Sequence, residues 1–246
     1  MNSRRYDILE LVDQKGYVAN QELADKFNIS LVTIRKDLKR MEDFGLIKRT
    51  HGGASLEGID QLHRKMVHNY RYKVDVVRKA INLIQEDDVI LLDEGSTNAL
   101  LAKVLLTIDK RLHIITNSLD IAQLIIKSPN IQLTVVGGTL QSQSRTLVGP
   151  LANYALNKIN VDKAFIGASG YSLEMGFTCN DFSQIEFVRN IAQARVKICV
   201  LVDQSKFKTV GTTTLLDLSD INYIVTNNII DENILQQLKQ KTTVLI

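Results

Sequence analysis

The sequence predicts an α/β protein in which a small N-terminal α+β domain precedes a larger domain with a mainly parallel sheet. Two observations lead to this prediction. Three helical patterns and a short hairpin fill residues 1–56, and seven apolar runs of strand length lie within residues 73–246, most of them separated by helical stretches. Strands that are apolar throughout and alternate with helices are typical of a parallel sheet covered on both faces. A chain of 246 residues has room for both domains.

The first two helices of the N-terminal domain are short and amphipathic. In the first, Ile8, Leu11 and Val12 recur at helical spacing, and Gly16 can end the helix. Asn20 is the expected N-cap of the second helix, because its side chain can accept a hydrogen bond from the first turn. A turn before residue 30 then separates this helix from the third.

The third helix is predicted to start at its cap, Ser30, and to run to about Phe44. Ile34, Leu38 and Met41 form its apolar stripe. The opposite side presents Val32, Thr33, Arg35, Lys36, Lys39 and Arg40. Two short helices, a tight turn and a third helix with a basic outer face predict a helix-turn-helix, whose third helix fits the major groove of DNA.

A hairpin follows the third helix. Gly45 is its expected C-cap, residues 46–51 are expected to form a strand, and Gly52–Gly53 allows a tight turn into residues 54–56. Such a hairpin is the wing of a winged helix-turn-helix, which the sequence therefore predicts over residues 1–56.

Positive charge is concentrated in this region. Six basic and three acidic residues between Thr33 and His51 give that segment a net charge of +3, which equals the charge of the whole chain. A charge run alone is usually a solvated face, but here it coincides with a helix-turn-helix and a wing. The pattern therefore favours a double-stranded DNA operator as a partner.

The candidate DNA-binding residues differ in their expected roles. Hydroxyl groups at the start of a helix can bind phosphate oxygens. Arginine or lysine near the start can form hydrogen bonds with base edges, and basic residues further along can bind the DNA backbone. The corresponding residues are Ser30 and Thr33 for phosphate, Arg35 and Lys36 for base edges, and Lys39 and Arg49 for the backbone, with His51 of the wing completing the set.

Residues 57–72 are polar with weak periodicity and are predicted to be a linker, followed by a helix from about Lys73 to Ile84. The predicted strands of the domain at residues 73–246 are Val89–Leu92, Leu112–Ile115, Leu133–Val136, Ala164–Ile166, Ile198–Val202, Tyr223–Val225 and Val244–Ile246. Helical stretches between them include Leu100–Leu106, Leu119–Ile126 and Ile185–Ala194.

Small and polar residues collect after these strands, where open α/β sheets bind ligands. Ser96 and Thr97 precede a helix and can hold a phosphate, Asp93 can accept from sugar hydroxyls, and Lys206 can pair with an anion. For one loop an ordinary turn is the simpler interpretation, but several loops at one edge favour a site. The candidates from these loops are Asp93, Gly95, Ser96, Thr97, Asn117, Ser118, Gly137, Gly138, Gly167, Asp203 and Lys206.

Several short segments in each half of the chain match one known family. In the first half they are Glu22–Ala24, Ile29–Ser30, Thr33–Leu38 and Arg49–Ala54. In the second half they are Asp93–Thr97, Ile115–Ser118, Gly137–Gly138, Val148–Pro150, Asp162–Phe165 and Asp203–Phe207. Through these segments both halves resemble the DeoR family of bacterial repressors. Lys36 stands where the family usually has arginine, which forks onto guanine as lysine does not.

This resemblance implies a fold and a ligand class for the second domain. The family's sensor domain is similar in fold to ribose-5-phosphate isomerase, and its effectors are typically phosphorylated sugars. Lys73 matches a helix lysine common in the family and joins the effector-binding set, whereas Lys65 stands where an arginine is usual. The implied function is repression of carbohydrate-metabolism genes, with a phosphorylated sugar controlling operator affinity.

Two other functions stay open. A sugar-phosphate isomerase or deaminase with an added DNA-binding domain is the main alternative. Isomerases of this fold carry an acid-rich Asp-Gly-Ala-Asp-Glu loop, whereas the comparable stretch here, Gly167–Tyr171, has no carboxylate. We therefore expect binding without catalysis and no catalytic residues. An activator or architectural protein that needs no ligand is the third function considered.

The sequence predicts no metal and no cofactor. The four histidines lack metal-ligand spacing, Gly137–Gly138 alone is no dinucleotide fingerprint, and there is no Walker sequence. Cys199 lies in an apolar run and is expected to be buried, whereas Cys179 lies in a polar stretch where exposure is open.

No signal peptide or membrane span is apparent, so a cytoplasmic protein without a membrane partner is expected. A homo-oligomer, dimer or tetramer, is also expected, because helix-turn-helix repressors pair on twofold DNA sites.

Overall fold

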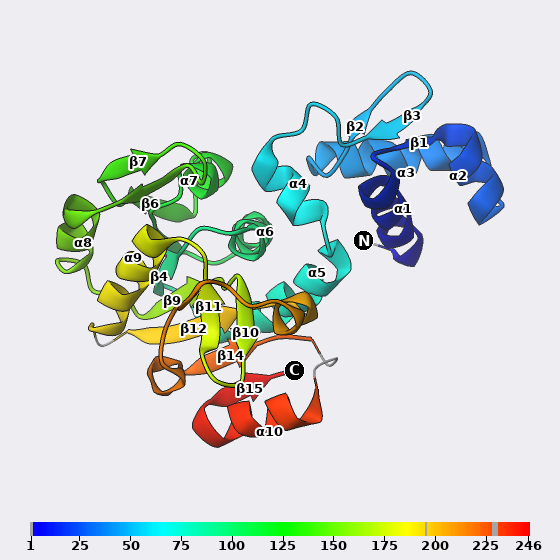
Figure 1. Cartoon of the computed structure of the whole chain (residues 1–246). Coiled ribbons are helices and arrows are strands. Elements are labelled where there is room, and N and C mark those ends of the chain that lie inside the picture. The colour runs from blue at the N-terminus through cyan, green and yellow to red at the C-terminus, as the bar shows by residue number, and fades with distance from the viewer. Residues whose placement is uncertain (1, 195, 228–230) are drawn as a thin grey trace. The chain divides into compact units, whose positions relative to one another are not determined.

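The computed structural model describes residues 2–194, 196–227 and 231–246 and divides the chain into two compact units (Figure 1). The first unit ends at Arg71 and the second begins at Tyr72. Each has its own core, and together they give the α/β protein with an N-terminal winged helix-turn-helix that the sequence predicts. Within the described residues, no helix is both long and apolar enough to cross a membrane.

The first unit packs four helices and a small sheet around one core. Its helices are α1 (Ser3–Lys15), α2 (Asn20–Phe27), α3 (Leu31–Asp43) and α4 (Gln61–Val67). Its antiparallel strands are β1 (Tyr17–Ala19), β2 (Lys48–Arg49) and β3 (Gly53–Ser55), in the order β1-β3-β2. Ile8, Ile34, Leu38 and Met41 are almost fully buried in this core, so the predicted apolar faces of the first and third helices are confirmed.

The predicted helix ends are confirmed at two positions, off by one residue at a third and wrong at a fourth. Gly16 ends α1 at a φ of 76°, and the Ser30 hydroxyl accepts from the amide of Thr33 at 3.3 Å. Gly45, at a φ of 69°, lies one residue beyond the C-cap of α3 and closes its last turn. Asn20 is not a cap: it is the first residue of α2, and Ala19 precedes it as the N-cap.

The correction at Asn20 follows from a strand that the sequence analysis missed. β1 runs directly into α2 and pairs with β3, with Val18 opposite Ala54. The backbone amide of Asn20 donates to the carbonyl of Gly52 at 2.7 Å, so the start of α2 is held by the wing rather than by a side-chain cap. A strand of three residues is too short to show a period.

The segment predicted as a linker is largely helical. α4 begins after Asp60, whose carboxylate accepts from the amide of His63 at 2.9 Å, and its last residue, Val67, packs on the core of the first unit. Most of the other α4 side chains are polar, which accounts for the weak periodicity. α5 (Tyr70–Ala80) starts three residues before the predicted Lys73 and gives way to a 3₁₀ turn, η1 (Ile81–Leu83).

The second unit contains the predicted parallel sheet. Its strands are β4 (Val89–Leu92), β5 (Leu112–Thr116), β6 (Ile131–Val135), β9 (Lys163–Ile166), β12 (Lys197–Leu201), β14 (Tyr223–Val225) and β15 (Thr243–Leu245). All neighbours pair in parallel, in the order β15-β14-β12-β9-β4-β5-β6.

Helices and two small antiparallel sheets accompany this sheet. The helices are α6 (Ser96–Leu105), α7 (Leu119–Ile125), α8 (Pro150–Leu156), α9 (Phe182–Ala192) and α10 (Glu232–Lys241), with 3₁₀ turns η2 (Gln204–Lys208) and η3 (Leu218–Asp220). The small sheets pair β7 (Thr139–Gln141) with β8 (Thr146–Val148), and β10 (Gly170–Ser172) with β11 (Gly176–Cys179) and β13 (Thr213–Thr214). The sequence analysis did not anticipate these five short strands.

The strand order places a topological switch between β4 and β9. The chain proceeds from β4 outward to β5 and β6, whereas from β9 it proceeds the other way, to β12, β14 and β15. In open α/β sheets, ligands bind outside the carboxyl ends of the strands at such a switch. The residues that follow β4, beginning with Asp93, occupy this position.

Candidate functional site

The exposed face of α3 is strongly basic. Arg35, Lys36, Lys39 and Arg40 are exposed, while the apolar stripe on the other side is buried. Lys39 pairs with Asp43 at 3.3 Å, and the other three cations form no ion pair within the described residues. They therefore remain available to an anionic partner.

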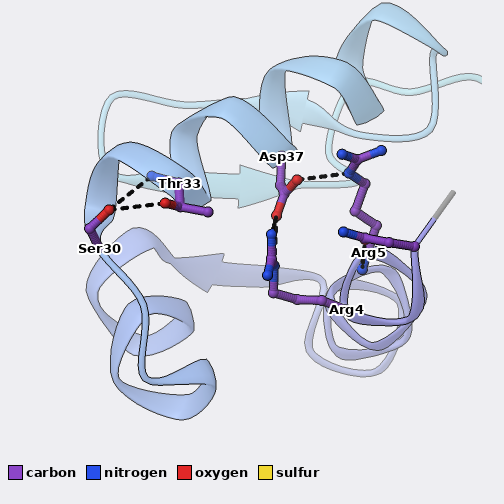
Figure 2. A network of polar contacts seen from close by, with 6 residues as sticks. Arg4, Arg5, Ser30, Thr33 and Asp37 are labelled. Atoms are coloured by element: carbon purple, nitrogen blue, oxygen red, sulfur yellow. Dashed lines mark hydrogen bonds and ion pairs between the residues drawn. The ribbon is translucent and has the colours of Figure 1, made fainter.

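A buried carboxylate ties this helix to α1 (Figure 2). The Asp37 side chain accepts from Nε of Arg5 at 2.7 Å and from Nε of Arg4 at 2.8 Å, each arginine taking a different oxygen. Burial alone would raise the pKa of Asp37, but the hydrogen bonds and charges of the two arginines outweigh it and hold the pKa below its usual value. The charge count along residues 33–51 missed this network, because both arginines lie outside that segment.

The two hydroxyl groups at the start of α3 are hydrogen-bonded to each other. The oxygens of Ser30 and Thr33 are 3.0 Å apart, and Ser30 also caps the helix (Figure 2). In the wing, the amide of Arg49 donates to Glu42 of α3 at 2.9 Å, while His51 is exposed at the tip. The predicted DNA-binding residues thus lie on α3, at its N-cap and on a wing that is hydrogen-bonded to α3.

The second unit has a polar edge at the carboxyl ends of β4 and β5. Leu92 pairs with Thr116 across these strands, so the next residues, Asp93 and Asn117, lie side by side. Both are almost fully buried, at 0% and 1% exposure. One oxygen of Asp93 accepts from Nε2 of Gln184 at 2.8 Å. Its other oxygen and both polar atoms of the Asn117 amide have no hydrogen-bond partner among the described residues.

The protonation of Asp93 reflects this environment. Burial raises its pKa to about 6, against the lowering effect of three polar groups close to the carboxylate: the Gln184 side chain, the amide of Glu94 and the Asn117 side chain. The carboxyl therefore changes charge within one unit of neutral pH.

Further unpaired polar atoms lie along the same edge. Oγ1 of Thr226 follows β14, and Oε1 of Gln204 follows β12; both are buried and unpartnered among the described residues. Buried polar atoms in folded proteins are normally hydrogen-bonded. Unpaired polar atoms thus follow four of the parallel strands, β4, β5, β12 and β14. A sheet edge of this kind is suited to a polar ligand with several hydroxyl or phosphate oxygens.

The start of α6 adjoins Asp93 and can hold an anion. Gly95 is the N-cap, at a φ of 121° that favours glycine, and no side chain caps the helix. The sequence analysis placed Ser96 and Thr97 just before this helix. In the structure they are the first two residues of α6. Their backbone amides belong to the group that an α-helix leaves without partners at its N-terminus, where phosphate binds well.

Comparison with known proteins identifies the chain. Residues 4–58 match the model of the DeoR-like helix-turn-helix domain, and residues 68–228 match that of the DeoR C terminal sensor domain. The chain belongs to the DeoR family.

Two named relatives are similar to this DeoR-family chain over nearly its whole length. The HTH-type transcriptional regulator GolR of Listeria innocua is 31% identical over 93% of this chain and 91% of its own length. The glycerol-3-phosphate regulon repressor of Haemophilus influenzae is 28% identical over 99% and 95%. The chain is accordingly a DNA-binding transcriptional regulator and not an enzyme.

A solved structure of ribose 5-phosphate isomerase A from Methanocaldococcus jannaschii is similar to the DeoR-family chain in fold alone. Its TM-score is 0.42, with 23% identity over 56% of this chain and 55% of that one, so the match spans about half of the isomerase. Among the residues that the structure describes, no group of three or more histidine, cysteine, aspartate or glutamate side chains is placed to hold a metal ion.

Some predicted effector residues of this DeoR-family regulator have structural tasks. Asp203 accepts from the amide of Ser205 at 2.9 Å and caps η2, on which Lys206 lies half-buried. The Ser118 hydroxyl caps α7. Gly138 packs against the backbone of Val148, where a side chain would not fit.

The remaining predicted positions divide between buried and open. Lys73 is buried on α5. Gly137 is exposed, and Gly167 follows β9 across the switch from Asp93.

Sequence reasoning missed two residues that contact this edge. Gln184, in the first turn of α9, donates to Asp93, and the buried thiol of Cys179 donates to Oε1 of Gln184 at 2.9 Å. Cys179, whose exposure the sequence left open, is thus buried, as Cys199 is. Asp181 caps α9 by accepting from two backbone amides. An aspartate in this position is a sequence signal for the start of a helix.

Proposed function

We propose that this DeoR-family protein is a transcriptional repressor of carbohydrate-metabolism genes whose operator affinity is controlled by a phosphorylated sugar. The observation that carries the effector half is the pair Asp93 and Asn117, whose unpaired buried atoms adjoin the free N-terminus of α6. Hydroxyls and phosphate are the two chemical groups that these neighbours can hold.

The operator half rests on the exposed basic face of α3 and on the wing. Arg35 and Lys36, near the start of the helix, are assigned to base edges, and Lys39 to phosphates. Ser30 and Thr33, near the helix start, are assigned to phosphates of the DNA backbone. Arg49 and His51 are assigned to such phosphates from the wing.

In the effector half, the amides and hydroxyls of Ser96 and Thr97 take the phosphate, which Lys206 helps to neutralise. Asp93 and Asn117 take the sugar hydroxyls. The other proposed contacts are Lys73, Gly95, Ser118, Gly137, Gly138, Gly167 and Asp203. The name of the Haemophilus influenzae relative, a glycerol-3-phosphate regulon repressor, supports both repression and a phosphorylated, hydroxyl-bearing compound as the signal.

The proposed mechanism is a shift between two arrangements of a homo-oligomer, dimer or tetramer. Two helix-turn-helix units pair on a twofold operator, and the effector binds one arrangement of the sensor domains better than the other. A coupling free energy of about 1–3 kcal/mol changes operator affinity roughly 5- to 150-fold.

The alternative, an isomerase or deaminase with a DNA-binding appendage, is not favoured. Gly167, Ala168 and Ser169, which follow β9 at the switch point, include no carboxylate to act as a base. The similar proteins of known name are regulators.

Fluorescence anisotropy tests the proposal. The probe is a labelled DNA fragment from upstream of the protein's own gene, titrated with the intact protein at several salt concentrations and then with a panel of sugar phosphates. Selective, steeply salt-dependent binding that one sugar phosphate alters is the expected result. Binding no better than to random DNA, or selective binding that no compound alters, contradicts the operator half or the effector half respectively.

A further inference from the structure

The side chain of Gln184 connects two elements of the second unit at the effector edge. Its Nε2 donates to Oδ2 of Asp93, which follows β4, at 2.8 Å. Its Oε1 accepts from the thiol of Cys179, at the end of β11, at 2.9 Å. Both ends of the amide are therefore engaged, and they are engaged in one orientation, with the NH₂ group toward the carboxylate.

This contact determines what Asp93 can offer to a ligand. Because Gln184 occupies one carboxylate oxygen, Oδ1 is left as a single acceptor, buried and without a partner among the described residues. Asn117, its neighbour across the strand pair, has one unused donor and one unused acceptor. A hydroxyl group can donate to Oδ1 of Asp93 and accept from the Asn117 amide at the same time, because it is both donor and acceptor.

We infer that Gln184 is a positioning residue for effector binding, which holds Asp93 so that Asp93 and Asn117 together select ligands that carry a hydroxyl group beside the phosphate. This inference rests on the proposed function, since it takes the sheet edge to be the effector site. It assigns the hydroxyl part of the ligand to Asp93 and Asn117, with Gln184 holding Asp93 in place, and the phosphate to the start of α6.

The backbone of Gln184 is anchored independently of its side chain. Asp181 accepts from the amide of Gln184 at 3.2 Å and from that of Ser183 at 2.8 Å, so the first turn of α9 forms without the glutamine amide group. The Cys179 thiol is the donor that orients this amide, and burial raises its pKa, which keeps it protonated. Substitutions at residue 184 therefore address the positioning of Asp93 rather than the fold of α9.

Isothermal titration calorimetry on the intact protein tests this inference. The probes are glucose 6-phosphate, fructose 6-phosphate, fructose 1,6-bisphosphate, ribose 5-phosphate and glycerol 3-phosphate, together with inorganic phosphate, which has no carbon-bound hydroxyl. The variants are Gln184→Leu, which lacks the side-chain amide, and Gln184→Glu, which keeps the shape but places a second carboxyl group beside Asp93 in place of the amide donor. Gln193→Leu, an exposed glutamine at the end of the same helix, is the matched control.

Gln184→Leu and Gln184→Glu are each expected to weaken the best sugar phosphate by roughly 10-fold or more, because a displaced Asp93 loses its own charge-assisted hydrogen bond to the ligand hydroxyl. Inorganic phosphate is expected to bind both variants as it binds the wild type, since its proposed site does not include residue 184. Gln193→Leu is expected to bind every probe normally. A merely structural role of Gln184 would weaken inorganic phosphate and the sugar phosphate together.

Cys179 supplies a second, milder comparison. Cys179→Ser keeps a donor for Oε1 of Gln184 and is expected to retain the affinity for the sugar phosphate. Cys179→Val removes the donor at similar volume and is expected to lower that affinity. Circular dichroism of each variant establishes that the fold is intact, and this result is required before the affinities are compared.

The outcomes separate the inference from the proposed function. If the wild type binds a sugar phosphate and the two Gln184 variants bind it equally well, the inference is overturned and the effector site stands. Parallel loss of inorganic phosphate also overturns it. If the folded wild type binds none of the sugar phosphates, the proposed function fails, and the role of Gln184 fails with it.

Discussion

The carboxylate of Asp37 on α3 lies 2.7 Å from Nε of Arg5 on α1, and this contact fixes the exposed basic helix to the first helix of the chain. Arg4 reaches the other oxygen of the same carboxylate, and Asp37 is only 3% exposed. Removal of its charge would leave two guanidinium groups facing a neutral partner. The orientation of α3, and with it of Arg35 and Lys36, therefore depends on a buried residue that lies apart from the exposed basic face.

The first prediction is that Asp37→Asn lowers the free energy of unfolding by about 1–3 kcal/mol, as expected for charge-assisted hydrogen bonds that become neutral. Because the pKa of Asp37 is lowered in the folded protein, its stabilising effect is present above the ordinary carboxyl pKa and disappears as the pH falls below about 4. Urea unfolding followed by circular dichroism, at neutral and at acidic pH, measures both effects.

Asp43→Asn is the matched control. Its pair with Lys39 spans 3.3 Å on the same helix, but both side chains are more than half exposed, so a change below about 0.5 kcal/mol is expected. Equal destabilisation by the two substitutions would show that the buried network contributes no more than a surface ion pair.

The second prediction separates the two ligands of the protein. Arg35→Ala is expected to weaken operator binding by about 1–3 kcal/mol and to leave sugar-phosphate binding unchanged, because a base contact is lost in the first unit only. Lys206→Ala is expected to do the reverse. Anisotropy with DNA and calorimetry with the sugar phosphate measure the two affinities. Equal loss of both affinities in either variant argues against this division.

The third prediction concerns pH and Asp93. Burial raises its pKa to about 6 in the folded protein, above its value in the unfolded chain, so the folded state binds this proton more tightly. The destabilisation caused by the buried charge therefore begins near pH 4, grows as the pH rises and is complete above about pH 6. A difference of about two pKa units corresponds to roughly 3 kcal/mol at most.

Asp93→Asn removes this titration. The stability of the variant relative to the wild type is expected to increase between about pH 4 and pH 6 and then to stay constant. Urea unfolding of both proteins across that range isolates the effect, because all other titrating groups are shared. A stability difference that does not change with pH would mean that Asp93 keeps an ordinary pKa.

The sequence predicted the parallel sheet well, because its central strands are apolar runs that are almost fully buried, whereas the edge strands β6 and β15 are partly exposed. A run such as Val89–Leu92, with helices alternating along the chain, is typical of a buried parallel strand. The sequence did not predict β1 or the small sheets, since strands of two to four residues show no reliable period. It also missed α4, whose mostly polar side chains hide the buried Met66 and Val67.

The candidate site was predictable in its place and not in its details. Asp93 and Asn117 could be grouped because the carboxyl ends of parallel strands meet at one edge. Which polar atoms remain unpaired there depends on packing: Ser118 became a helix cap, whereas Asn117 kept both amide atoms unused. Partners distant in sequence, such as Gln184, 91 residues from Asp93, have no local signal.

The fourth prediction contrasts the two adjacent glycines that follow β6. Gly138 has a φ of 141°, and a Cβ there would lie 2.6 Å from the carbonyl oxygen of Val148. Gly138→Ala is therefore expected to lower the free energy of unfolding by about 1–3 kcal/mol from backbone strain, and further through this clash.

At Gly137, a Cβ would meet no described atom within 4 Å outside the adjoining residues, and the residue is exposed. Gly137→Ala should change stability by less than about 0.5 kcal/mol. Because Gly137 is among the proposed effector contacts, the added methyl group is expected to weaken sugar-phosphate binding in a protein of normal stability. Urea unfolding and calorimetry on both variants measure the two effects. A Gly137→Ala protein that binds the sugar phosphate normally would exclude Gly137 from the site and confine the ligand to the strand ends nearer Asp93.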